Sequence, residues 1–301
     1  MKTSTSEPDK IARFWMGVAM IALLGVAGVG ILASSGTTRA GTKEPIQVAV
    51  RPDTATTLAA AVVGADDKGT GTFKGVVTFK GTPPKPKLIV GKGDPNQVAK
   101  PEDRAICAAD DLFSEELIVN AKADNGVANV FIYLQKAPAG YTAPAVPEEP
   151  VVFDQKGCQF IPHALLVRCK QKVLVKSGDN LVHNTHTTPL RNNGFNKAIK
   201  VNDRDGEPLT YEKPEPLPVN VTCDFHKWMK AYHLPLDHPF MAVTDADGKF
   251  EIKGLPPGEH TFVVWHETGL YLNRKLTVKI TADKETEEKL SFTAAQFKVG
   301  S

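Results

Sequence analysis

The chain has 301 residues, of which 42% are hydrophobic and 7% are aromatic, and its formal net charge is +2. This length is enough for two domains, and the nearly neutral charge argues against nucleic acid as a partner. The sequence contains no glycine-rich phosphate loop, no Gly-x-Ser-x-Gly elbow and no His-Glu-x-x-His motif. We therefore predict that the protein is not an enzyme.

An uncharged run of 20 residues, 14–33, stands near the start of the chain. As a helix it would be about 30 Å long, which is enough to cross a bilayer. Lys10 and Arg13 precede it, which predicts a cytoplasmic segment at 1–13 and an extracytoplasmic remainder. We expect a single-pass anchor in the cell membrane with a periplasmic domain. The alternative is a signal peptide cleaved near residues 33–35, with release of the protein to the periplasm.

Residues 34–70 are rich in Ala, Thr, Gly and Asp and predict a linker. Beyond them, alternation of apolar and polar residues predicts β-strands, most clearly at 73–81, 126–135 and within 240–267. Residues 245–248, Asp-Ala-Asp-Gly, predict a hairpin turn because glycine adopts positive φ readily. No long helical period follows the linker, so we expect an all-β protein.

Three of these segments resemble one known family. The string VTDADGKFEIKGLPPGEHTFVV at 243–264 resembles the transthyretin-like β-sandwich of the carboxypeptidase regulatory-like, or carbohydrate-binding-like, domain. GTFKGVVTFKG at 71–81 is similar to the opening strand of that family, and ANVFIYLQ at 128–135 is similar to a second strand. The resemblance implies a transthyretin-like β-sandwich.

A long segment separates the second of these strands from the third. We infer a single sandwich in two parts, 71–148 and 239–296, divided by an inserted domain at 149–238. Insertion at an exposed loop is tolerated because the ends of a domain often lie close together. The alternative is two successive domains, with 72–135 forming an independent sheet.

The inserted segment holds six of the eight histidines: His163, His183, His186, His226, His233 and His238. Within it, Val219, Val221 and Cys223 fall on one face of a strand, which directs the thiol to the interior. His226 and Met229 follow at intervals of three residues. A thiolate and imidazoles bind copper or zinc, and a weak axial thioether is typical of blue copper.

Residues 150–236 resemble the cupredoxins, the type 1 copper proteins that include plastocyanin and amicyanin. The motifs are VHN at 182–184 and CDFHKWM at 223–229, and the implied fold is a Greek-key β-sandwich. The resemblance implies four copper ligands: His183, Cys223, His226 and Met229. It also implies that Asn184 ties the two ligand loops together. The combined pattern further resembles extracytoplasmic bacterial proteins that are labelled methylamine-utilisation-like.

Zinc is the competing metal, because the sequence also offers a closed set of one cysteine and three histidines: Cys223, His183, His186 and His226. His186 and His163 are additional candidate ligands, and His163 is otherwise a structural residue or one at the rim of the site. The other histidines are expected to be surface or hinge residues (His233, His238) or non-ligands (His260, His266).

A metal-bound Cys223 leaves three cysteines, of which two can pair in the oxidising extracytoplasmic space. A bond from Cys107 to Cys158 would join the sandwich to the insert, whereas Cys158 with Cys169 would lie within one hairpin. Trp228 is expected to be a packing residue rather than an exposed contact.

Four protein ligands leave no open position for a substrate. The resemblance to cupredoxins therefore implies a one-electron carrier that docks to a redox protein. Two alternatives stay open. One is a non-redox binding or structural module that contacts carbohydrate or protein and holds a structural zinc or no metal. The other is a copper storage or delivery protein that uses His163 and His186.

Overall fold

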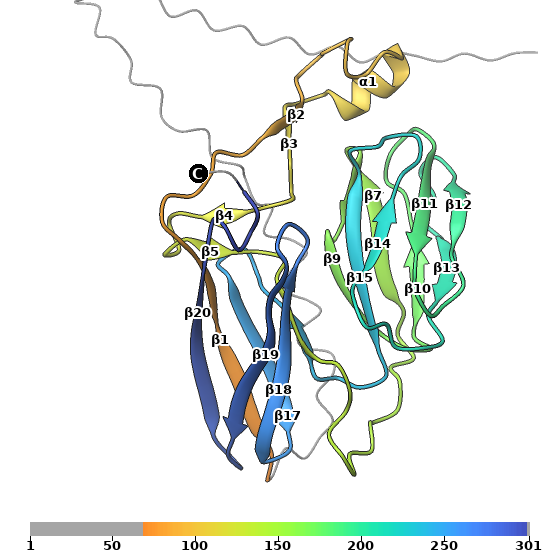
Figure 1. Ribbon diagram of the computed structural model, residues 1–301. Coiled ribbons are helices and arrows are strands. Elements are labelled where there is room, and N and C mark those ends of the chain that lie inside the picture. The colour runs from red at the N-terminus through yellow and green to blue at the C-terminus, as the bar shows by residue number, and fades with distance from the viewer. Residues whose placement is uncertain (1–68, 300–301) are drawn as a thin grey trace, which may run out of the picture. The chain divides into compact units, whose positions relative to one another are not determined.

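The computed structural model describes residues 69–299. The predicted segments 1–13 and 14–33, and the linker up to residue 68, lie outside the described residues. All of the described residues belong to one compact unit, Gln47–Ser301. Between residues 69 and 299, no helix is long and apolar enough to cross a membrane. This part of the chain is almost entirely β, as the alternating sequence predicts (Figure 1).

Two sheets form a first sandwich. One sheet contains β1 (Gly71–Lys80), β4 (Val119–Asn120), β5 (Gly126–Val127), β17 (Lys249–Leu255) and β20 (Glu285–Thr293). The other contains, in spatial order, β16 (Met241–Val243), β6 (Phe131–Leu134), β18 (Gly258–His266) and β19 (Leu270–Ile280). β1 pairs antiparallel with β17 and parallel with β20, and β6 lies between β16 and β18. Strands from before and after the intervening segment therefore share both sheets.

The alternation in β17 explains which of its faces is buried. Phe250 and Ile252 are buried, whereas Lys249, Glu251 and Lys253, which alternate with them, are exposed. The predicted turn lies directly before β17. A Cβ on Gly248 would lie 2.4 Å from the carbonyl oxygen of Val77, and φ there is +79°, so only glycine fits. The turn connects the two sheets, however, and its flanking strands do not pair as the predicted hairpin.

Residues 151–236 form a second sandwich (Figure 1). One sheet has the order β13 (Glu207–Thr210), β10 (Lys172–Val175), β7 (Val151–Lys156), β8 (Gln159–Ile161). The other has the order β12 (Asn196–Ile199), β11 (His183–Thr188), β14 (Val219–Thr222), β15 (Lys230–Leu236), β9 (Ala164–Arg168). Apolar side chains from both sheets, including Phe153, Val173, Val221 and Ala231, form one buried cluster. This core supports the strand ends that carry the candidate ligands.

An arm, residues 81–118, leaves the first sandwich after β1 and packs on the core of the second. It contains three short elements: β2 (Leu88–Val90), α1 (Pro101–Cys107) and β3 (Leu112–Phe113). Val90, Val98 and Leu112 of the arm are buried in the same apolar cluster as Phe153. The arm therefore contributes to the second sandwich although it is an excursion from the first.

A disulfide fixes the arm to the second sandwich. It joins Cys107, the last residue of α1, to Cys158 in the turn between β7 and β8. The sequence left two pairings open, Cys107–Cys158 and Cys158–Cys169, and the structure contains the first. Cys169 is a buried free thiol.

His233 and His238 are both 0% exposed, so the expectation that they lie at the surface is wrong. His233 points inward from β15, and its Nδ1 lies 3.0 Å from the hydroxyl of Tyr211. The backbone N–H of Phe240 donates to Nδ1 of His238 at 3.2 Å. β15 is absent from the predicted strands, and its alternation is what turns His233 toward the core.

Candidate metal centre

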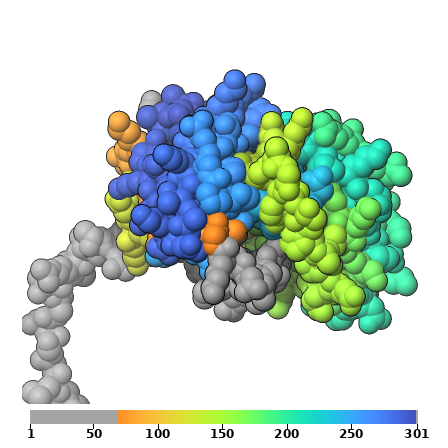
Figure 2. Space-filling model, turned by 90° about the horizontal axis from the view of Figure 1, so that it is seen from below, coloured from red at the N-terminus to blue at the C-terminus, as the bar shows by residue number. Residues whose placement is uncertain are grey.

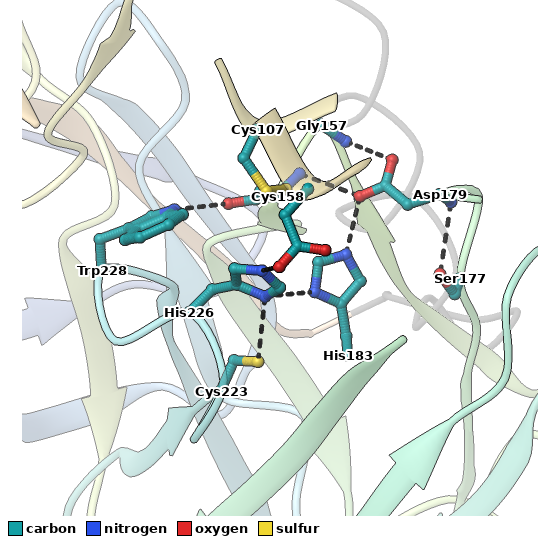
Figure 3. Close-up of a disulfide and its surroundings, with 10 residues drawn as sticks. Cys107, Gly157, Cys158, Ser177, Asp179, His183, Cys223, His226 and Trp228 are labelled. Carbon is teal, nitrogen blue, oxygen red and sulfur yellow. Dashed lines mark hydrogen bonds and ion pairs between the residues drawn. A yellow bond between two sulfur atoms is a disulfide. The ribbon is translucent and has the colours of Figure 1, made fainter. Parts of the chain in front are cut away.

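Three side chains of the second sandwich meet where β11 begins and its antiparallel neighbour β14 ends. His183 is the first residue of β11, Cys223 follows β14, and His226 lies in the turn before β15. The Nδ1 atoms of His183 and His226 are 3.1 Å apart, and Cys223 Sγ lies 3.8 Å from His226 Nδ1 (Figure 3). These separations suit ligands of one ion, because metal bonds to nitrogen and sulfur are about 2.0–2.3 Å long.

The local sequence explains why the thiol and the turn residues come together. In β14 the alternation buries Val219 and Val221, and Cys223 continues the same face at 1% exposure. The backbone N–H of Met229 donates to the carbonyl of His226 at 2.8 Å, and that of Cys223 donates to the carbonyl of Met229 at 3.3 Å. The loop is thus closed by its own backbone. Met229, 2% exposed, shares the buried cluster with Cys223.

Asp179 is the functional residue that sequence reasoning missed. Its carboxylate lies 2.8 Å from His183 Nε2 and accepts hydrogen bonds from the N–H groups of Gly157 at 2.7 Å and Cys158 at 2.9 Å (Figure 3). A hydrogen bond at Nε2 leaves Nδ1 as the atom that faces the centre. Asp179 precedes His183 by four residues, and a carboxylate at that position was the available signal.

Asn184 connects the two chain segments that carry the ligands. Its Oδ1 accepts a hydrogen bond from the N–H of Asp224 at 2.6 Å. Its Nδ2 donates to the Asp224 carboxylate at 2.8 Å and to Oδ1 of Asn196 at 2.9 Å. β11, β12 and the loop after Cys223 are therefore held by one side chain that is 4% exposed.

Replacing Asn184 with alanine is expected to lower the free energy of unfolding by about 1–3 kcal/mol, because the buried Asn184 side chain is lost and the backbone N–H of Asp224 loses its acceptor in a partly buried place. Chemical denaturation of the metal-free protein measures the change. The control is Asn180→Ala, since Asn180 is exposed and is expected to stay within about 0.5 kcal/mol of the parent. Equal effects of the two substitutions would contradict the assigned role.

The electrostatics of the centre favour a thiolate. Burial opposes charge on Cys223. Hydrogen bonds from the His183 and His226 side chains and from the backbone N–H of Asn184 outweigh burial and lower the pKa of the thiol to about 6. Burial likewise opposes charge on His183, but Asp179 and Cys223 outweigh it and raise the pKa of the imidazole. Because the thiolate is the form that binds metals, the centre is suited to a cation near neutral pH.

The additional candidate histidines lie apart from this group. The ligand atoms of His183, Cys223 and His226 all lie within 4.8 Å of one another, and neither His163 nor His186 belongs to that group. His186 is partly exposed, and its Nδ1 lies 3.2 Å from the Asp224 carboxylate. His163 is buried between two carboxylates, with Nε2 on Glu267 and Nδ1 3.7 Å from Glu115. His260 and His266 are likewise outside the group, and they contact Pro256 and Thr268.

The arm covers the side of the centre at His226, which is only 4% exposed. Asp103 of α1 places a carboxylate oxygen 3.7 Å from His226 Nε2. Trp228 packs with its ring centroid 5.3 Å from that of His226, and its indole N–H donates to the Cys158 carbonyl at 3.2 Å. Phe225, by contrast, is 58% exposed beside the ligands. The ligands are thus shielded from water by residues of two separate chain segments.

No family model matches the chain, and no curated protein matches it. Several solved structures are similar to part of it, and they are cupredoxins or contain copper. Amicyanin from Paracoccus versutus is 15% identical, with 35% of this chain and 97% of amicyanin covered and a TM-score of 0.26. A purple cupredoxin from Nitrosopumilus maritimus is 14% identical, with coverages of 29% and 98% and a TM-score of 0.24. A copper-containing nitrite reductase from Thermus scotoductus is 20% identical at a TM-score of 0.26, with 33% of this chain and only 25% of the reductase covered.

Proposed function

We propose that this protein is a membrane-tethered, extracytoplasmic copper protein that transfers single electrons through a type 1 copper site. One observation carries the proposal: two imidazole Nδ1 atoms and a thiol with a lowered pKa converge in a buried place. His183, Cys223 and His226 would hold the ion through two imidazoles and a thiolate, and Met229, at the end of the same loop, would add a thioether. Copper held in this way supplies a one-electron couple between Cu(I) and Cu(II).

The chain's own residues perform three tasks in this function. Asp179 orients His183 so that Nδ1 faces the metal. Asn184 holds β11 against the loop that carries Cys223 and His226. The buried cluster and the arm exclude water. With every near ligand supplied by protein, no position is left for a substrate, which favours an electron carrier over an oxidase.

The proposed organisation places the copper domain inside another domain. We propose that 149–238 is a cupredoxin-like domain inserted between two parts, 71–148 and 239–296, of a transthyretin-like sandwich. The pairing of β1 with β17 and β20, and of β6 with β16 and β18, supports the division. Residues 14–33 would anchor the protein and 34–70 would tether it, so that an extracytoplasmic redox protein is its partner.

The burial of the centre also favours a second candidate function, a non-redox module with a structural zinc. Structural zinc sites are closed, and His226 at 4% exposure is nearly as inaccessible as His183 at 0%. In that case the first sandwich would carry the function by contacting carbohydrate or protein. The two candidates differ in whether the metal changes its oxidation state reversibly.

The visible spectrum of the full-length protein, purified in detergent and loaded with Cu(II), decides between them. We expect an intense thiolate-to-copper absorption that disappears on reduction, returns on reoxidation and is absent from Cys223→Ser. The matched control is Cys169→Ser, which removes the other free cysteine and should leave the absorption intact. A colourless protein that retains stoichiometric zinc would overturn the carrier function and support the module.

A further inference from the structure

The disulfide lies directly against the candidate metal centre. The sulfur atoms of Cys107 and Cys158 and a ring nitrogen of His226 all lie within 4.8 Å of one another. Cys158 also forms such a group with Asp179 and His183. Figure 3 shows the disulfide beside the two imidazoles. Cys107 is 2% exposed and Cys158 0%, so both residues are shielded from solvent.

The chemistry of this group depends on the state of the sulfurs. In the disulfide neither sulfur is a thiolate, and thiolates are the form that binds metals. Two thiolates and one imidazole are a donor set for thiophilic ions such as Cu(I) and Zn(II). The Asp103 carboxylate, 3.7 Å from His226 Nε2, is too distant for a hydrogen bond and lies on the same helix as Cys107. A carboxylate is therefore available beside the three donors.

We propose that Cys107, Cys158 and His226 form a second metal site, one that binds Cu(I) and exists only when the disulfide is reduced. The reductant is a dithiol: its two thiols form a disulfide, the Cys107–Cys158 bond breaks, and the two hydrogens pass to these sulfurs. Each thiol then releases one proton when Cu(I) binds. The site goes beyond single-electron transfer, since it makes copper binding depend on the thiol redox state of the surroundings.

His226 belongs to both sites, which connects them. In the oxidised protein its imidazole serves only the group with His183 and Cys223. His226 forms one group with Cys223 and another with Cys107 and Cys158. In the reduced protein, the thiolates of these two groups compete for copper. Reduction therefore adds a route by which Cu(I) leaves or enters the first centre.

In this proposal, a reductant reaches the buried disulfide when the arm opens locally. Its strands β2 and β3 have three and two residues, and α1 has seven. Elements this short have little stability of their own and open locally more readily than the sandwich sheets. Opening of the arm would expose Cys107 and Cys158 without unfolding of β11, β14 or β15.

Cu(I) titration against a chromophoric chelator tests the proposal in the full-length Cys223→Ser variant, in which the first centre lacks its thiolate. The protein is titrated oxidised, and again after anaerobic reduction with dithiothreitol and removal of the reagent. We expect one additional equivalent of tightly bound Cu(I) after reduction. Cys107→Ser in the same background should weaken that binding at least tenfold, whereas Cys169→Ser should not change it.

Two results would overturn the second site. The first is an equal Cu(I) stoichiometry before and after reduction. The second is binding that survives both Cys107→Ser and, separately, His226→Gln, since thiols of an unfolded chain bind Cu(I) without the imidazole. Circular dichroism of the reduced protein and X-ray absorption at the copper edge, where two sulfurs and one nitrogen are expected, accompany the titration. Because Cys223 is absent throughout, the result is independent of whether the first centre is a type 1 site.

Discussion

Replacing Asp179 with alanine is expected to lower the free energy of unfolding of the metal-free protein by about 3–5 kcal/mol, the usual cost of breaking a buried ion pair. The carboxylate is 4% exposed, and its removal leaves His183 Nε2 and the amides of Gly157 and Cys158 without an acceptor. Burial would raise the pKa of Asp179, but His183 and the two amides outweigh it and lower that pKa, so the group acts as an anion.

The same substitution is expected to weaken copper binding about 10–100-fold, the usual effect of losing the group that orients a ligating histidine. Chemical denaturation and competition with a copper chelator measure the two effects. The control is Asp154→Ala on β7, which removes an ion pair with the exposed Arg204 and should cost at most about 1 kcal/mol. If Asp179→Ala changed neither quantity more than this control, the orienting role would be wrong.

Acidification from pH 7 to pH 4 is expected to unfold the protein, and buried histidines are the main cause. Burial lowers the pKa of His233 and His266 to about 3 and that of His238 to about 4. Their unfolded-state pKa is about 6.5, so below that pH the unfolded chain binds protons that the folded one does not. Each histidine then costs about 1.4 kcal/mol per pH unit, and three together approach the total stability of an ordinary domain.

The free energy of unfolding, measured by chemical denaturation at a series of pH values, checks this expectation. The slope below pH 6.5 should decrease by about one proton in His233→Leu, because that side chain no longer titrates in the unfolded state. Stability that is constant from pH 7 to pH 4, or a slope unchanged in this variant, would contradict it. The metal-free protein is used, so that loss of a bound ion does not contribute.

Two parts of the structure differ in how far the sequence determines them. The strand that ends in Cys223 and the turn that brings back His226 follow from a period of two and a spacing of three, which are local properties of the chain. The contacts of the arm are not local: Asp103 reaches His226 from a distant segment without periodicity, so no sequence pattern predicts it. The cysteine count alone left the Cys107–Cys158 pairing open beside Cys158–Cys169. His233 was misjudged for a different reason: β15 was not predicted, so the alternation that turns this side chain inward was not applied.

The surroundings of His163 could not be predicted from the sequence either. Its position beside Pro162 suggested a structural or rim residue, and its surroundings come from two other chain segments, through Glu115 of the arm and Glu267 after β18. Burial opposes its charge, but the two carboxylates outweigh burial and raise the pKa of the imidazole to about 10. The two carboxylates favour the charged form of the imidazole, and only the fold brings them beside His163.

The pairing of β1 has a consequence for how the chain assembles. Val76 pairs with Lys249, and Phe79 with Phe292. Of β1, the first strand within residues 69–299, only Thr78 pairs with an early neighbour, Gly126 of β5, so most of the strand finds its partners only when β17 and β20 are synthesised. The second sandwich closes over much shorter separations, and contacts between residues near in sequence form faster. We therefore expect the inner sandwich to be complete while β1 still has an unpaired edge. During that interval the exposed strand is the part of the nascent protein most in need of protection from aggregation.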